Sequence, residues 1–101
     1  MNIDTVVSGS SMLVKLNGRL DSTNAPKLER EINAKLEGIA SLTLDFDELM
    51  YVSSAGLRVV LACQKKMNAV KGSMVVKNPN DFVMDIFDVT GLLDILNIEK
   101  A

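Results

Sequence analysis

The chain has 101 residues and a formal net charge of -2, with no histidine, no tryptophan and a single cysteine, Cys63. The missing histidine excludes the Ser-His-Asp triad and the usual zinc sites, and a lone thiol excludes an internal disulfide. Eleven basic and thirteen acidic residues without a run of one sign give no support to direct nucleic acid binding. We expect one domain over residues 1–101.

No targeting or cofactor signal stands out. The N-terminus lacks a basic segment followed by a long apolar stretch, so we expect no signal peptide. The longest apolar runs are far short of the roughly 20 residues that span a bilayer, and the glycines form no phosphate-cradling loop. We therefore expect a soluble cytoplasmic monomer with no cofactor, no metal and no membrane insertion.

The first half of the chain predicts a hairpin, a helix and a strand. Apolar alternation predicts strands over Ile3–Val7 and Met12–Leu16, with a small polar turn between them. Pro26 after a polar stretch predicts a helix that begins near residues 22–24. Alternation resumes in Ser41–Phe46, which predicts a third strand.

The second half predicts a helix, a strand and two short helices. Ala55–Cys63 is almost wholly apolar and is followed by polar residues, which predicts a helix half buried at its start and solvated at its end. Met74–Lys77 predicts a fourth strand, Asn78–Asp81 a turn and cap for a short helix, and Leu92–Ile98 a last helix. The order β-β-α-β-α-β-α-α predicts an α/β fold, a mixed and mostly parallel sheet of four to five strands with helices mainly on one face.

Two adjacent serines stand where the third strand passes into the apolar helix. Serine is a good helix cap, so capping alone explains one of Ser53 and Ser54. The unpaired N–H groups and the macrodipole at a helix N-terminus also accommodate a phosphate. Arg58, one turn beyond Ser54, is either a docking residue or an ordinary surface residue. The residues leave both interpretations of the serines open.

Residues 19–24 form a second connection from a strand to a helix. Such connections emerge at the carboxyl ends of parallel strands, so this loop and the serine pair should lie close together. Asp21 would then stand near Ser54, to accept a hydrogen bond from the hydroxyl or to repel a phosphate. The alternative is a capping and turning role for the loop's polar residues, which are Asp21, Ser22, Thr23 and Asn24.

Three stretches in this order resemble the STAS domain family, and most closely its single-domain anti-sigma factor antagonists. They are LNGRLDSTNAPKLEREI, LTLDFDELMYVSSAGLRVVLACQKKM and VVKNPNDFVMDIFDVTGLLDIL, of which Gly18–Asp21 and Ser54–Leu57 are the most specific parts. The resemblance implies a non-enzymatic protein that, unphosphorylated, binds an anti-sigma factor that is also a serine kinase, and so frees a sigma factor. Phosphorylation abolishes this binding until a phosphatase reverses it.

The resemblance implies that Ser54, two residues before Gly56, is the phosphorylated residue. The family commonly has Asp before this serine and a small residue such as Ser after it; here Ser53 precedes it, so Ser53 is the alternative acceptor. The implied partner-binding residues are Asp21, Ser22, Thr23, Asn24, Ser53, Ala55 and Arg58. Two other functions stay open: a STAS subunit of a membrane lipid transport complex docked on its ATPase, and a small enzyme using Asp21 and Ser54, which lacks an evident base.

Overall fold

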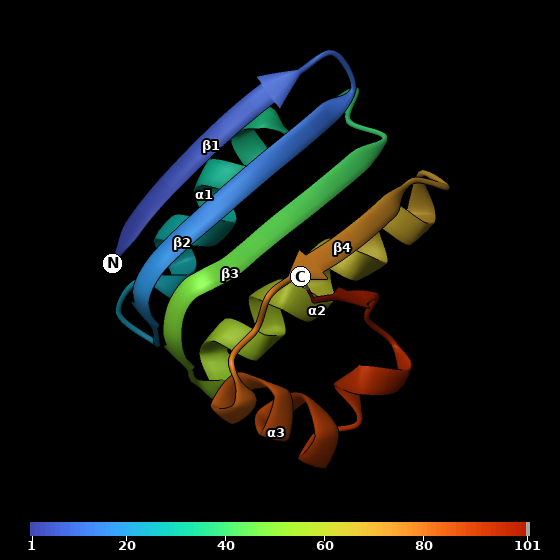
Figure 1. The fold of residues 1–101 in the computed structure, drawn as a ribbon. Coiled ribbons are helices and arrows are strands. Elements are labelled where there is room, and N and C mark those ends of the chain that lie inside the picture. The colour runs from blue at the N-terminus through green and yellow to red at the C-terminus, as the bar shows by residue number, and fades with distance from the viewer. Residues whose placement is uncertain (101) are drawn as a thin grey trace.

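Strands and helices alternate after an opening hairpin in the computed structural model, which describes residues 1–100 (Figure 1). The hairpin turns at Gly9, whose φ of +59° suits a two-residue turn. The elements in chain order are β1 (Asn2–Ser8), β2 (Ser11–Leu20), α1 (Ala25–Lys35), β3 (Ser41–Val52), α2 (Ser54–Ala69), β4 (Ser73–Lys77), α3 (Asp81–Val89), the 3-10 turn η1 (Leu92–Asp94) and β5 (Ile98–Glu99).

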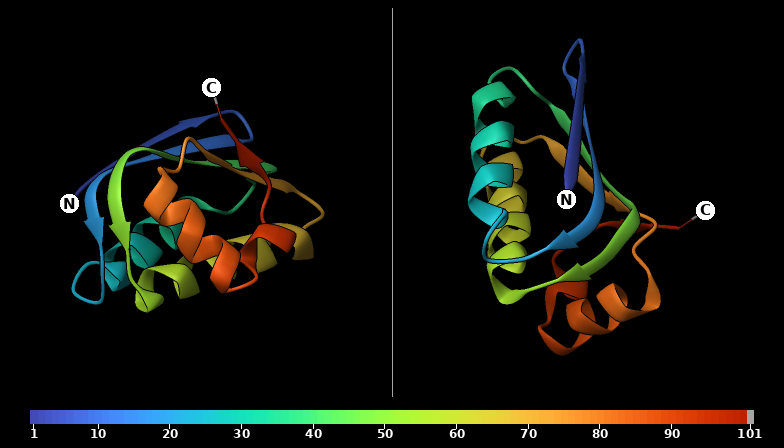
Figure 2. Two further views of the ribbon diagram at one scale, coloured as in Figure 1. Left: turned by 60° about the horizontal axis from the view of Figure 1, so that its bottom comes forward. Right: turned by 90° about the vertical axis from the view of Figure 1, so that its left-hand side faces the viewer.

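The strands form one sheet in the order β1-β2-β3-β4-β5. The β1–β2 pair is antiparallel, and each of the other pairs is parallel. Helices α1 and α2 cover one face of this sheet, and α3 lies beyond its lower end (Figure 2). The predicted fold, a mixed and mostly parallel sheet with helices mainly on one face, is confirmed.

The core lies between the sheet and the two long helices. Alternate residues of β2 and β3, such as Val14 and Leu44, are fully buried on this side, as a period of two requires. Leu28 and Ile32 of α1 meet them from the helix side, and each buried side chain of this size contributes roughly 1.5–3 kcal/mol. The ring of Phe46 lies 6.4 Å from that of Phe87 between centroids, which ties α3 to the same core.

The prediction that burial fades along the second helix is wrong. Helix α2 keeps one face buried as far as Met67, and Val60, Cys63 and Gln64 lie on the same stripe. The exposed lysines of its later turns fall between these positions, because helical periodicity places them on the opposite side. The helix therefore packs on the sheet over nearly its whole length.

The prediction of a last helix over Leu92–Ile98 is also wrong. The chain makes one 3-10 turn and then adds β5 to the sheet, where Ile98 pairs with Val76. The Val76 N–H donates to the Asn97 carbonyl at 2.9 Å. A helix this short gains little in isolation, so hydrogen bonds to the free edge of β4 decide the conformation. Leu96 is still buried, as the apolar pattern requires.

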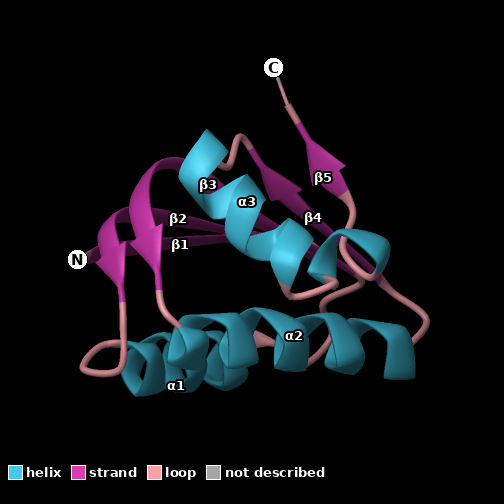
Figure 3. Ribbon diagram, turned by 90° about the horizontal axis from the view of Figure 1, so that it is seen from below, coloured by secondary structure: helices cyan, strands magenta, loops and turns pink. Residues whose placement is uncertain are grey.

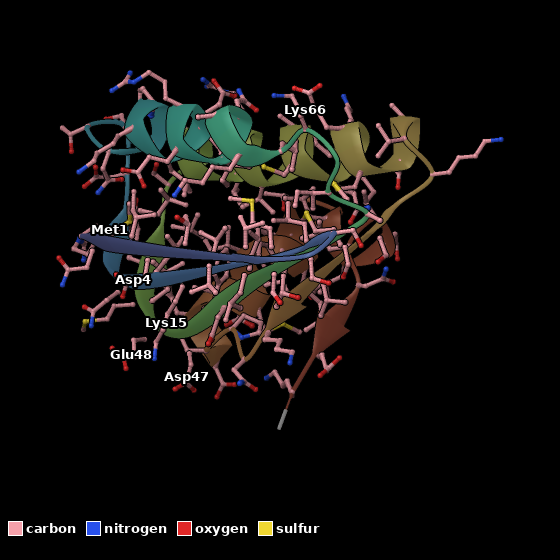
Figure 4. All side chains as sticks on the ribbon, turned by 90° about the horizontal axis from the view of Figure 1, so that it is seen from above. Met1, Asp4, Lys15, Asp47, Glu48 and Lys66 are labelled. Carbon is pink, nitrogen blue, oxygen red and sulfur yellow. The ribbon has the colours of Figure 1, made fainter. Side chains whose placement is uncertain are left out.

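The sheet face turned away from α1 and α2 carries a row of charges of alternating sign. The row runs across all five strands through directly paired positions: Asp4, Lys15, Asp45, Lys77 and Glu99. Figure 4 shows Asp4 and Lys15 on this side, with Glu48 beside them. The Lys15 ammonium lies 3.4 Å from a Glu48 carboxylate oxygen, an exposed pair worth at most about 1 kcal/mol.

Candidate functional site

The two connections from strand to helix meet at the lower end of the sheet. Strands β2 and β3 stay paired to their last residues, Leu20 and Val52, and the Ser53 N–H donates to the Leu20 carbonyl at 2.9 Å. Figure 3 shows the two strands ending side by side before the chain enters α1 and α2. The prediction that both connections lie close together is confirmed.

The two serines have different surroundings. Ser53 is the N-cap of α2 with an extended backbone, and its Oγ accepts a hydrogen bond from the Gly56 N–H at 3.3 Å. Ser54 is the first residue of the helix and is exposed, and its side chain has no hydrogen bond to any residue in the range 1–100. The capping role of Ser53 is confirmed, and the hydroxyl of Ser54 is free to react.

Gly56 lets the start of α2 approach the strand ends closely. A Cβ at this position would lie 2.7 Å from Leu20 Cγ and 2.8 Å from Val52 Cγ2, closer than a real Cβ comes to a neighbouring atom. Only glycine therefore fits here without a shift of the Leu20 and Val52 side chains or of the helix. The contact fixes the N-terminus of α2, and with it Ser54, against both β2 and β3.

The loop between β2 and α1 is held by its own side chains. The Asn24 side chain bridges the loop: its Oδ1 accepts from the Asp21 N–H at 2.8 Å, and its Nδ2 donates to the Arg19 carbonyl at 2.7 Å. Asn24 occupies the N-cap position of α1 but makes no side-chain cap bond there. The loop is thus a closed turn, and α1 begins at Ala25, just after the predicted start.

Asp21 is committed to its own loop. One carboxylate oxygen accepts from both the N–H and the hydroxyl of Thr23, at 3.0 and 2.5 Å. These donors hold the pKa of the Asp21 carboxyl below its ordinary value, the hydroxyl of Thr23 having the largest effect. Of the two alternatives for Asp21, a hydrogen bond from Ser54 is absent within the described part of the chain, and the donors on its Oδ1 both come from Thr23.

A shallow groove of about 420 Å³ separates the first turns of α1 and α2. It brings together three of the predicted site residues, Ser22, Ala55 and Arg58, while Thr23 lies exposed in the adjoining loop. The remaining lining residues are Ala25, Pro26, Glu29 and Val59. Ser22, Ala55 and Arg58, from two different connections, therefore line one groove, and Ser54 itself is not among its lining residues.

The STAS domain family matches residues 2–101 of the sequence. The chain belongs to this family. Its relatives include BtrV of Bordetella bronchiseptica, provisionally named an anti-sigma factor antagonist, which is 36% identical over 89% of this chain and 78% of its own length. The anti-sigma-B factor antagonist of Bacillus subtilis is 29% identical over 97% of this chain and 90% of its own. The predicted family is confirmed, and the class of protein predicted from the sequence, an anti-sigma factor antagonist, is the one that both relatives are named for.

Solved structures share the fold of this STAS domain. The Bacillus cell fate determinant SpoIIAA in its phosphorylated form superimposes with a TM-score of 0.80. It is 20% identical, and the match covers 99% of this chain and 91% of that one. At this identity the likeness concerns the arrangement of strands and helices, which is the arrangement that places Ser54 at a sheet end.

The STAS domain also carries a group of contacts that the sequence did not reveal. The Arg19 guanidinium carbon lies 4.2 Å from the centroid of the Tyr51 ring, and the Tyr51 ring stacks on Phe82 at 5.7 Å. We call Arg19, Tyr51 and Phe82 the aromatic strip. Its only sequence signal was Phe82, which falls outside the helical stripe of Val83 and Phe87.

Residues 1–100 of the STAS domain contain no cluster of three or more His, Cys, Asp or Glu residues that would hold a metal ion. Within the same residues, no helix is both long and apolar enough to cross a membrane. Burial raises the pKa of the Cys63 thiol to about 11, so this side chain stays a protonated thiol at neutral pH.

Proposed function

We propose that this STAS domain is an anti-sigma factor antagonist whose partner is an anti-sigma factor that is also a serine kinase. The unphosphorylated protein binds this partner in the cytoplasm and releases a sigma factor. Phosphorylation of Ser54 ends the binding, and a phosphoserine phosphatase restores it. The names of the relatives at 36% and 29% identity support the class of protein.

The observation that carries the proposal is the contrast between the two serines. The Oγ of Ser53 is occupied as a helix cap, whereas Ser54 is exposed and free of side-chain hydrogen bonds to the described residues. A kinase reaches an exposed, unbonded hydroxyl without first breaking the end of a helix. Ser54 is therefore the acceptor, and Ser53 holds the helix turn that presents it.

A phosphate on Ser54 changes the surface without unfolding the helix. It adds a charge of about -1.5 to -2 at pH 7, and the free N–H groups and dipole at the start of α2 favour an anion there. The same charge falls within the surface formed by Asp21, Ser22, Thr23, Asn24, Ser53, Ala55 and Arg58, which we assign to partner binding. Burying this dianion against a partner costs more than the interface gains, so the complex separates.

The geometry favours regulation over catalysis. An enzyme using Asp21 and Ser54 needs the carboxylate to accept the proton of the hydroxyl, but the two side chains share no hydrogen bond among the described residues. The Thr23 donors also lower the pKa of the Asp21 carboxyl and so make it a weaker base. A STAS subunit docked on a transporter ATPase would need no modification at Ser54. The anti-sigma factor antagonist and the transporter subunit therefore differ in one measurable property, the transfer of phosphate to Ser54.

The test is incubation of the protein with ATP and the kinase-like anti-sigma factor encoded nearest its gene, followed by intact mass measurement. We expect a gain of one phosphate in the wild type and in Ser53→Ala, and no gain in Ser54→Ala. A gain that survives Ser54→Ala and disappears in Ser53→Ala would move the acceptor to Ser53. No gain with any such kinase, together with copurification of a transporter ATPase, would overturn the proposal.

A further inference from the structure

We propose that the kinase partner binds a second surface, which is formed by the aromatic strip and the outer face of α3. The partner makes this contact with an apolar centre that is flanked by its own lysine or arginine side chains. The proposal rests on the proposed function, since it assigns a further contact to the same partner. It adds a binding surface that is separate from the modified serine.

The surface is apolar where a free sheet end would ordinarily be polar. Phe82 is 48% exposed, Met50 next to Tyr51 is 68% exposed, and Val89 is 81% exposed. Phe82 and Val89 lie seven residues apart on α3, so they share one face of the helix. Single exposed apolar residues are common, but a group that includes stacked rings marks a contact site.

The surface is held in place before any partner arrives. Asn80 caps α3, its Oδ1 accepting from the Val83 N–H at 2.8 Å. Its Nδ2 donates to the carbonyls of Leu49 and Met50 at 3.2 and 3.4 Å, which fixes the start of α3 against the end of β3. Phe82 and Tyr51 therefore keep their stacking without the entropy loss that a mobile aromatic side chain would suffer on binding.

The charge around the surface indicates the chemistry of the partner. The charged residues of α3 are all acidic, namely Asp81, Asp85 and Asp88, and each is exposed. Asp81 has a cation near it, Lys100 at 3.8 Å. Asp85 lies on the same helix face as Phe82 and Val89, between them. The positive charge of the aromatic strip, Arg19, lies over the Tyr51 ring. A partner that covers the apolar residues of α3 thus meets carboxylates, and basic side chains complement them.

The second surface lies close to the phosphorylation site. Tyr51 lies three residues before Ser54, a stretch of chain that spans at most about 10 Å. Figure 3 shows α3 beside the end of β3, on the same side of the molecule as the starts of α1 and α2. A single partner that reaches Ser54 is therefore able to contact the aromatic strip at the same time.

The experiment measures the Kd of the purified kinase partner for the full chain and its variants, together with KM and kcat for phosphorylation. We expect Phe82→Ala to weaken binding about tenfold and raise KM by the same factor with kcat unchanged, as an aromatic contact at an interface centre does. Val70→Ala is the matched control, since Val70 is 64% exposed at the far end of α2, and should stay within twofold.

Charge reversal gives a second variant that does not touch an apolar side chain. Asp85→Lys should weaken binding several-fold at low salt, with the difference shrinking at high salt, because screening removes the contribution. Glu37→Lys, an exposed reversal beyond the end of α1, is its control and should stay within twofold. Thermal unfolding of each variant checks that the fold is kept.

The outcomes separate this inference from the proposed function. If a phosphate on Ser54 abolishes binding while Phe82→Ala and Asp85→Lys stay within twofold of wild type, the second surface is wrong and the proposed function stands. If the wild type neither binds nor is phosphorylated by the kinase, the proposed function fails and the partner named here fails with it. If the chain self-associates and Phe82→Ala abolishes that, a second copy occupies the surface and the inference is overturned.

Discussion

Gly56→Ala should destabilise the protein although it replaces glycine with the best helix former inside a helix. The new Cβ would lie 2.7 Å from Leu20 Cγ and 2.8 Å from Val52 Cγ2. Both side chains are buried, at 0% and 1% exposure, so neither can turn away toward solvent. These two side chains must repack into less favourable positions, or the helix must move off the strand ends.

The magnitude follows from two opposing terms. Alanine gains about 1 kcal/mol over glycine in a helix interior, whereas overpacking of a core costs about 1–3 kcal/mol. Contacts on both sides of the new methyl group place the cost in the upper part of that range, so the net loss is about 1–2 kcal/mol. At about 4–8 °C per kcal/mol for a domain of this size, Tm should fall by roughly 5–15 °C.

Thermal and urea unfolding measure the loss, and a double-mutant cycle identifies its cause. Val52→Ala removes the Cγ2 atom that the new methyl group would meet, so it should cost about 1 kcal/mol less in the Gly56→Ala background than in wild type. A Gly56→Ala variant as stable as wild type, or a cycle without coupling, would refute the argument that α2 is seated directly on β2 and β3.

Four other substitutions test three separate features. Ser53→Ala should lower the unfolding free energy by about 1 kcal/mol and Ser54→Ala by less than about 0.5, compared by urea unfolding, and equal losses would contradict the capping role of Ser53. Gln64→Met should leave the unfolding free energy unchanged or raise it by up to about 1 kcal/mol, because Gln64 Oε1 is buried without a partner among the described residues. A loss above about 2 kcal/mol in the same assay would contradict this expectation. The pKa of the Cys63 thiol is about 9 in the unfolded chain and about 11 in the folded protein. Its contribution to the unfolding free energy is therefore fully present below pH 9 and is lost as the pH rises toward 11. The unfolding free energy should therefore fall more steeply between pH 9 and 11 in wild type than in Cys63→Ala, and parallel curves would contradict the shift.

The elements that periodicity specifies were predicted well from sequence. Met12, Val14 and Leu16 recur at every second position and are buried, while Leu13 and Lys15 point to the other face, so the strand and its buried face follow from local pattern alone. Strand β3 extends past Phe46 to Val52, which the polar residues Asp47 and Glu48 concealed. Its register against β2 shifts where this stretch begins, and such an irregularity is set by pairing in three dimensions.

The site was predicted in outline because topology places it. The order of strands and helices brings both connections to one sheet end, whatever the side chains do. The direction of Asp21 was not predictable, since a turn within the loop gives its carboxylate two nearby donors on Thr23. The aromatic strip joins residues of β2, β3 and α3, so the position of Phe82 outside the buried stripe of α3 does not by itself predict the contacts with Tyr51 and Arg19.

A thiol-reactive dye on the sheet face turned away from α1 and α2 should report partner binding without disturbing it. The row from Asp4 to Glu99 pairs each lysine with acidic neighbours and holds three acids against two lysines, so the charges of this face largely offset one another. Val6 is 58% exposed at the far end of β1 from Ser54, and Cys63 is buried and protonated. Val6→Cys therefore gives the chain a single reactive thiol, on the side where nothing is expected to dock.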